Sequence, residues 1–134
     1  MTAISWQGRR LHFLGIGGSG MSGLARIALQ RGAIVTGSDR AASGAVEALR
    51  EMGAQIAIGH DASQLPAGPL TVVRSTAITD ANPEFAAARD RGDEILHRSE
   101  LLAQLVDDRR TIAVAGAHGK TTTSSMIAHA LSQL

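Results

Sequence analysis

The chain has 134 residues, of which 44% are hydrophobic, and a formal net charge of +1. This is enough for one ordinary domain with a core and too little for two complete domains. A charge so close to zero gives no indication of nucleic-acid or membrane binding. The absence of cysteine excludes disulfides, thiolate catalysis and thiolate metal sites. No apolar stretch reaches membrane-spanning length, so we expect a cytoplasmic protein.

The first predicted unit is a strand, a glycine-rich turn, a helix and a second strand. Residues 11–14 are largely apolar and lead directly into a GxGxxG pattern at residues 15–20. The helix that follows has apolar residues at i, i+3, i+4, i+7 and i+8 and ends at Gly32. A second strand covers residues 33–36. Asp39 then follows at about the distance at which dinucleotide-binding folds place a ribose-binding acid.

The glycine-rich turn is predicted to bind a diphosphate. A helix N-terminus presents unpaired N–H groups and a partial positive charge, and glycines let a phosphate approach the backbone closely. A glycine-rich turn without a ligand is the alternative, but the framing by strand, helix, strand and acid favours a diphosphate-containing ligand. The candidate residues of the loop are Gly15, Gly17, Gly18, Ser19, Gly20 and Met21.

Three further strands are predicted at residues 55–58, 70–73 and 94–96, separated by helical patterns. Asn82 followed by Pro83 is a strong helix start between the last two of these strands. Alternation of strands and helices at this rhythm predicts an α/β fold, a Rossmann-like parallel sheet with helices on both faces.

Polar residues follow the carboxyl ends of these strands, where ligands bind in a doubly wound sheet. The hydroxyls of Ser75 and Thr76 are candidates for nucleotide contacts, with capping of the next turn as the alternative. A solvent-exposed turn explains His60 as well as a ligand contact does. Arg98 and Glu100 are explained equally by a surface ion pair. The polar residues at these strand ends are His60, Asp61, Ser75, Thr76, His97, Arg98, Ser99 and Glu100.

A second combination of strand, glycine turn and helix follows a charged break at residues 107–110. Backbone N–H groups of such a loop can cradle phosphates, Lys120 can neutralise the β and γ phosphates, and the Thr121 hydroxyl can bind Mg²⁺. The pattern is a shortened GxxGKT, and a capped helix is the alternative. Lys120 is the single lysine of the chain. The predicted strand is 111–115, and the loop is Gly116, Ala117, His118, Gly119, Lys120, Thr121 and Thr122.

Five segments, which together extend from about residue 12 to residue 134, resemble the Mur ligase family. Within the family, the resemblance is strongest to the ligases that join L-alanine to UDP-N-acetylmuramate. Ala117, Thr76 and Ser99 depart from the usual pattern and bear on ligand contacts. The segments are HFLGIGGSGMSGLA at 12–25, GSD at 37–39, STAI and NPE within 75–84, HRSE at 97–100 and AGAHGKTTT at 115–123.

The resemblance implies a three-domain enzyme of which this chain is the N-terminal part. Residues 1–108 would form a Rossmann-like domain that binds the UDP-sugar, and residues 109–134 would begin a truncated ATP-binding domain. The implied UDP-sugar contacts are Gly15 to Met21 for the diphosphate, Ser38, Asp39, Ser75 and Thr76 for the uridine, and His97, Arg98 and Glu100 for the sugar.

The implied reaction is an ATP-dependent amide formation in peptidoglycan precursor synthesis, through an acyl phosphate that the amine of L-alanine displaces. ATP and Mg²⁺ are the implied cofactors, with Gly116 to Thr122 around ATP, Lys120 as catalytic residue and Thr121 as metal ligand. The implied partners are UDP-N-acetylmuramate, L-alanine and ATP, without nucleic acid or membrane. This chain alone is expected to bind the UDP-sugar weakly at best and not to catalyse the ligation.

Two other classes of function remain open. An NAD-dependent oxidoreductase domain would use the same first loop and Asp39, but it gives no role to Lys120. A non-catalytic nucleotide sensor, such as a regulatory domain of an ion transporter, would form a dimer whose stability changes with bound nucleotide. We also expect the segment after Arg110 to pack on the first domain, pair with another copy or be mobile, because alone it buries little surface.

Overall fold

The computed structural model describes residues 4–107 and 120–133. Within these residues, five parallel strands form one sheet in the order β3-β2-β1-β4-β5. The order reverses between β1 and β4, which is the arrangement of a doubly wound sheet. The strands are β1 (Arg10–Leu14), β2 (Ile34–Asp39), β3 (Gln55–Ile58), β4 (Thr71–Arg74) and β5 (Glu94–His97).

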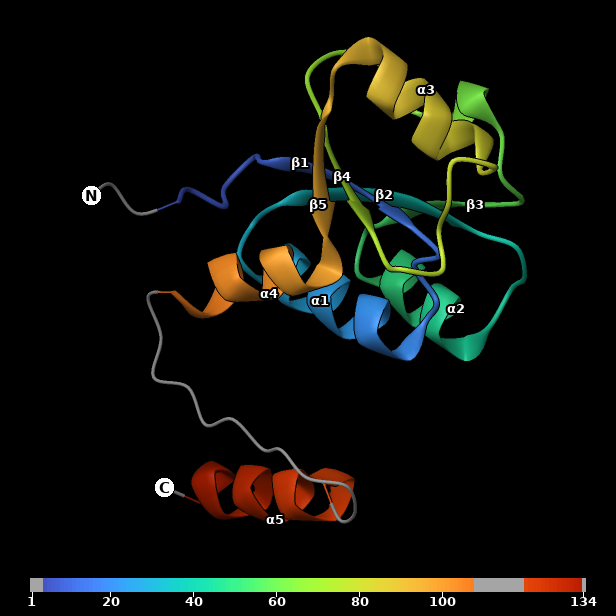
Figure 1. Cartoon of the computed structure of the whole chain (residues 1–134). Helices are drawn as coiled ribbons and strands as arrows, with labels where there is room; N and C mark the ends of the chain where they lie inside the picture. Colours follow the sequence, from blue (N-terminus) through green and yellow to red (C-terminus); the bar gives the residue numbers. More distant parts are fainter. Residues whose placement is uncertain (1–3, 108–119, 134) are drawn as a thin grey trace.

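Helices cover both faces of the sheet. Figure 1 shows α1, α2 and α4 together on one face and α3 on the opposite face. The predicted fold class, a parallel α/β sheet with helices on both faces, is therefore confirmed for this part of the chain. The helices are α1 (Ser19–Gln30), α2 (Gly44–Glu51), α3 (Pro83–Arg91), α4 (Arg98–Val106) and α5 (Lys120–Ser132), with a 3-10 turn, η1 (Ala62–Gln64).

Alternation along the central strand β1 divides the interior into two cores. Leu11 and Phe13 are fully buried in the larger core, which α1, α2 and α4 cover. Leu14 points to the other face and packs in a smaller core with Phe85 and Ala88 of α3. Successive strand residues face opposite sides of a sheet, so His12 shares the α3 face with Leu14.

The helix ends follow the expected capping chemistry. Ser43 accepts a hydrogen bond from the Val46 N–H at the start of α2. Asn82 accepts from two backbone N–H groups at the start of α3, and Pro83 takes the first helical position. Gly92 ends α3 with φ of 78°, a left-handed conformation that glycine adopts without steric cost. The start of α3 at Asn82 and Pro83 confirms the helix start predicted there.

The helix predicted after the second glycine loop is present as α5, and Lys120 is its first residue. Met126 and Leu131 of this helix are 68% and 52% exposed. Packing on the first domain, one of the three outcomes expected for this segment, is therefore not seen among the described residues. The predicted strand at 111–115 lies outside those residues.

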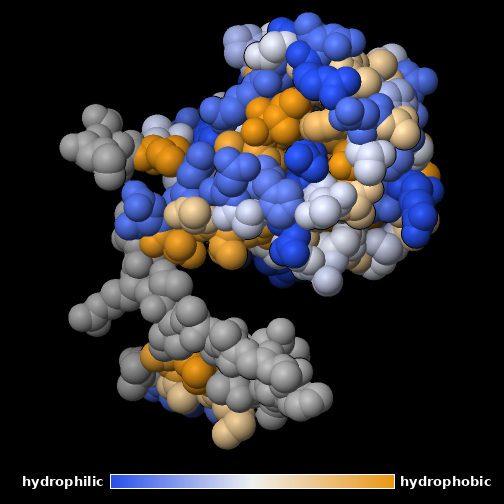
Figure 2. All heavy atoms as spheres, viewed as in Figure 1, coloured by the Kyte–Doolittle hydropathy of each residue, from blue (hydrophilic) through white to orange (hydrophobic). Residues whose placement is uncertain are grey.

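The molecular surface is mainly hydrophilic over α3, and hydrophobic residues are exposed along α4 (Figure 2). Leu101 and Leu105 of α4 are buried, whereas Leu102 is 47% exposed. The period of the helix explains this difference, because residues four apart share one face and their neighbours do not. In the described ranges, no helix has both the length and the apolar character to cross a bilayer.

Gly37 and a control glycine on α1 provide a test of the close packing between β1 and β2. A Cβ at Gly37 of β2 would lie 2.8 Å from the Phe13 carbonyl oxygen and 2.9 Å from the Ile16 Cδ1. The carbonyl belongs to the neighbouring strand and cannot move without disturbing the sheet. We expect Gly37→Ala to lower the free energy of unfolding by about 1–3 kcal/mol. Urea denaturation followed by circular dichroism measures this change.

The matched control is Gly23→Ala on α1, where an added Cβ meets nothing within 4 Å. Replacing a helical glycine by alanine restricts the unfolded chain, so we expect a gain of roughly 0.5–1 kcal/mol. Equal stability of the two variants would contradict the close approach of β1 and β2 at Gly37.

Candidate functional site

A cavity of about 820 Å³ lies at the carboxyl ends of the strands. Parallel strands bring these ends to one edge of the sheet, so loops that are far apart in sequence meet there. The volume is in the range of small-molecule sites. The lining residues are Gly15, Gly17, Gly18, Ser19, Gly20 and Met21 after β1, Asp39 to Ser43 at the end of β2, His60 after β3, Ser75, Ala77, Ile78, Thr79 and Asn82 after β4, and Arg98 after β5.

The N-terminus of α1 lines this cavity without a side-chain cap. Gly18 is its N-cap residue, and the first turn contains no acidic residue. In the described part of the chain, no protein acceptor binds the backbone N–H groups of Ser19 or Gly20. Unpaired N–H groups and the helix dipole give this end of α1 a positive potential. The arrangement suits an anion.

The glycines of the loop make room for protein groups as well as for a ligand. Gly15 has φ of 76° and turns the chain out of β1. A Cβ at Gly17 would lie 2.9 Å from the Asp39 Oδ2, and one at Gly20 would lie 3.1 Å from an Arg98 guanidinium nitrogen. The sequence predicts that these glycines let a diphosphate approach the backbone closely. The structure adds that Gly17 admits the acid of β2 and Gly20 admits Arg98.

Asp39 connects the end of β2 to the glycine loop. Its Oδ2 accepts a hydrogen bond of 2.8 Å from the Gly17 N–H, and its Oδ1 accepts one of 3.3 Å from the Ala41 N–H. A carboxylate has about four lone-pair positions, so these two bonds leave acceptor capacity. Asp39 can therefore hold the loop and still accept a hydrogen bond from a ligand in the cavity.

Arg98 lies against Gly20 and has no acidic partner among the described residues. The ion pair with Glu100 that the sequence left open is not formed. Glu100 instead accepts the His97 backbone N–H at 3.1 Å and completes a capping box for α4. An anion between the guanidinium and the positive end of α1 would be attracted by both.

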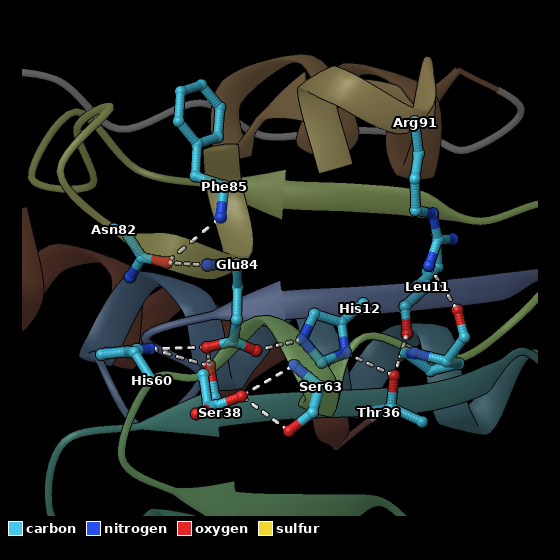
Figure 3. A network of polar contacts seen from close by, with 12 residues as sticks. Leu11, His12, Thr36, Ser38, His60, Ser63, Asn82, Glu84, Phe85 and Arg91 are labelled. Atoms are coloured by element: carbon cyan, nitrogen blue, oxygen red, sulfur yellow. Dashed lines mark hydrogen bonds and ion pairs between the residues drawn. The ribbon is translucent and has the colours of Figure 1, made fainter. Parts of the chain in front are cut away.

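A buried polar network lies on the α3 face of the sheet (Figure 3). The carboxylate of Glu84 is fully buried between two histidines. One oxygen, Oε1, lies 2.8 Å from the His12 Nε2. The other, Oε2, lies 2.7 Å from the Ser38 Oγ and 2.8 Å from the His60 Nδ1. At the far end of the network, the His12 Nδ1 lies 2.7 Å from the Thr36 hydroxyl.

These contacts determine the charge of Glu84. Burial by itself would raise the pKa of Glu84, but the hydrogen bonds from His12, Ser38 and His60, together with the charge of His12, outweigh burial and lower it. Glu84 is therefore a carboxylate near neutral pH. Because a carboxylate only accepts hydrogen bonds, all three groups that face it must donate.

Several predicted contact residues do not line the cavity. Ser38 is fully buried, donates its hydroxyl to Glu84 and does not line the cavity, which does not favour its predicted direct contact with a uridine. Thr76 lies 3.0 Å from the His97 Nε2, and the His97 Nδ1 accepts from the Ser99 N–H as the cap of α4. The predicted residues that do line the cavity are Gly15, Gly17, Gly18, Ser19, Gly20, Met21, Asp39, Ser75 and Arg98.

Other lining residues were missed by the sequence reasoning. They belong to the loops that follow β2 and β4. The sequence feature that could have identified them is their position directly after a parallel strand, where ligands bind. Asn82 was predicted only as a helix start, and Ser43 caps α2, yet both also line the cavity. The missed residues are Arg40, Ala41, Ala42, Ser43, Ala77, Ile78, Thr79 and Asn82.

The predicted second phosphate site lies largely outside the described residues. This applies to Gly116, Ala117, His118 and Gly119, and to the side chains of Lys120, Thr121 and Thr122. The backbone of residues 120–122 forms the first turn of α5. Over 4–107 and 120–133, no group of three or more acidic or histidine side chains is arranged to hold a metal ion.

The reversed strand order and the glycine loop at its centre define a Rossmann-like α/β domain. The model of the Mur ligase family, catalytic domain, matches residues 10–110. The chain therefore belongs to the Mur ligase family.

The relatives that the chain matches are much longer. It is 55% identical over 122 residues to the UDP-N-acetylmuramate–L-alanine ligase of Clavibacter michiganensis, covering 91% of this chain and 25% of that protein. It is 54% identical over 125 residues to the ligase of that name in Streptomyces coelicolor, covering 93% of this chain and 27% of that protein. The chain thus spans about a quarter of the length of these curated relatives.

Solved structures show the same fold. The UDP-N-acetylmuramate-alanine ligase of Thermotoga maritima superimposes with a TM-score of 0.86 and 34% identity, over 92% of this chain and 29% of that one. A murein peptide ligase from Psychrobacter arcticus gives a TM-score of 0.85 and 34% identity, over 90% of this chain and 26% of that one.

The buried carboxylate makes the stability of the chain depend on pH. The pKa of Glu84 is lowered in the folded state from an ordinary value of 4.5. A group of this kind contributes stability that is present above the unfolded pKa and is lost as pH falls through the folded pKa. We expect the free energy of unfolding in urea to fall as the pH is lowered through the unfolded pKa of 4.5 and further below, and Glu84→Gln to weaken this dependence.

At pH 7, Glu84→Gln is expected to lower the free energy of unfolding by roughly 1–3 kcal/mol, because an amide cannot accept from all three donors. The matched control is Glu47→Gln, since Glu47 is exposed and forms a surface pair with Arg50. This control is expected to keep the wild-type dependence on pH. If the free energy of unfolding of Glu84→Gln depended on pH as that of wild type does, Glu84 would not be the source of the acid sensitivity.

Proposed function

We propose that this chain is the UDP-sugar-binding part of a ligase that joins L-alanine to UDP-N-acetylmuramate in peptidoglycan precursor synthesis. The observation that carries the proposal is the guanidinium of Arg98 beside the uncapped N-terminus of α1, without an acidic partner among the described residues. A diphosphate between them would accept hydrogen bonds from the α1 N–H groups and from Arg98 at once.

The strand order suggests how the ligand lies. The glycine loop after β1 is central, so a diphosphate there would direct the two ends of the ligand to opposite sides. The uridine would lie on the β2 and β3 side, near Asp39, and the sugar on the β4 and β5 side, near Arg98. Ser75 follows β4, so this arrangement places it nearer the sugar than the uridine to which the resemblance assigns it. The curated relatives that carry this ligase name, at 54% and 55% identity, support the proposed substrate.

Residues 109–134 are proposed as the beginning of an ATP-binding domain, after a UDP-sugar domain at 1–108. The start of α5 at Lys120 supports this division, since residues 116–119 then immediately precede a helix N-terminus. In the proposed site, Gly116 to Thr122 hold ATP, Lys120 neutralises its phosphates and Thr121 binds Mg²⁺. Bound ATP supplies the phosphoryl group that activates the carboxylate of the sugar. The proposed cellular location is cytoplasmic.

Isothermal titration calorimetry tests the proposed ligand. The chain is expected to bind UDP-N-acetylmuramate and to show no comparable heat with NADH. Arg98→Gln should weaken UDP-N-acetylmuramate about 10- to 100-fold, because it removes a charge-assisted hydrogen bond to phosphate.

Arg89→Gln is the matched control, since Arg89 is an exposed arginine paired with Asp80 and does not line the cavity. It should leave the affinity unchanged. Tighter binding of NADH would favour the oxidoreductase alternative. An unchanged affinity in Arg98→Gln would remove the main support for the diphosphate site.

A further inference from the structure

We propose that His60 binds the nucleoside part of the ligand and that Glu84 is a positioning residue that determines which ring nitrogen of His60 carries the proton. The proposal rests on the proposed UDP-sugar site and adds one contact to it.

His60 connects the buried network to the cavity. It follows β3 at the carboxyl edge of the sheet, its side chain is 22% exposed, and it lines the cavity. Glu84 and His12 are buried in the interior, and neither lines the cavity. Figure 3 shows the ring of His60 directed toward the Glu84 carboxylate from the opposite side to His12. Of the described members of this network, His60 is therefore the one that can touch a ligand.

The network fixes the tautomer of His60. Its Nδ1 faces two acceptors, the Glu84 Oε2 at 2.8 Å and the Ser38 Oγ at 3.0 Å. The single hydroxyl proton of Ser38 is directed to Glu84 at 2.7 Å, so toward His60 the Ser38 oxygen can only accept. The Nδ1 must then carry the proton, since the bond made by one ring nitrogen sets the state of the other.

The second nitrogen of the ring, Nε2, is left for the ligand. No hydrogen-bond partner for it is present in residues 4–107 and 120–133. In neutral imidazole with a proton on Nδ1, the Nε2 is an acceptor. The matching ligand group is a hydrogen-bond donor on the β2 and β3 side of the cavity. A uridine offers a ribose hydroxyl or the imide N–H of its base.

His60→Asn separates this contact from the support that the network needs. The asparagine amide can place an N–H near the position of Nδ1 and keep the bond to Glu84, but it has no group at the position of Nε2. We expect UDP to bind about three- to tenfold more weakly, with little change in the urea midpoint. His129→Asn on α5 is the control and should leave the affinity for UDP unchanged.

Nitrogen NMR of the ¹⁵N-labelled chain tests the role of Glu84 without any ligand. The wild-type spectrum should show His60 with a protonated Nδ1 and a bare Nε2, and addition of UDP should shift the Nε2 resonance. In folded Glu84→Gln, the amide can donate to Nδ1, so the tautomer population should move toward Nε2–H. A protonated Nε2 in the wild-type chain at pH 7.5, or an unchanged tautomer in Glu84→Gln, overturns the positioning role.

Two analogues identify the donor. If the base is the donor, the wild-type chain should bind N3-methyl-UDP more weakly than UDP. The His60→Asn variant should bind the two ligands equally well. If the ribose is the donor, 2′,3′-dideoxy-UDP should show this behaviour.

The outcomes separate the two proposals. A wild-type chain that binds neither UDP nor UDP-N-acetylmuramate overturns both the proposed function and the His60 contact. If the wild-type chain binds these ligands no more tightly than His60→Asn does, the His60 contact alone is overturned.

Discussion

The buried carboxylate of Glu84 is the interaction on which the architecture of the site depends. It lies on α3 and binds side chains from β1, from β2 and from the loop after β3. Four segments separated by up to 72 residues are thus held by one acidic group. Transferring a charged carboxylate from water into the protein interior costs free energy, and the three hydrogen-bond donors around Glu84 offset that cost. The same bonds that position α3 therefore position the cavity edge at His60.

The opposite side of the cavity is built differently. The guanidinium of Arg98 is exposed, lies beside the start of α1 and has no acidic partner among the described residues. Long exposed side chains keep many rotamers and lose them on binding. A ligand on the Arg98 side would gain electrostatic energy, part of which is offset by the conformational entropy that the Arg98 side chain loses. A ligand on the His60 side would meet groups that are already fixed. The cavity thus combines a preorganised wall with an adaptable one.

Much of the fold followed from the sequence, because local signals decided it. Asn82 with Pro83 predicted the start of α3, and the glycine loop predicted the start of α1. The Glu84 network could not be predicted, since NPE indicates a helix start and says nothing of a histidine 72 residues away. Ser38 was expected to face a ligand, but strand register turns it toward α3 and Glu84. Contacts of this kind depend on which faces meet after folding, which one sequence does not contain.

The glycine pattern has more than one physical cause, and this limits what the motif alone can indicate. Gly37 admits a neighbouring carbonyl, Gly17 admits a carboxylate and Gly20 admits a guanidinium. None of these close approaches requires a nucleotide, so GxGxxG by itself does not select a ligand. What selects an anion is the combination of Gly20 with Arg98, since a glycine there brings a guanidinium to the positive end of a helix. The argument for a diphosphate therefore rests on a charge that the structure leaves uncompensated within the described residues.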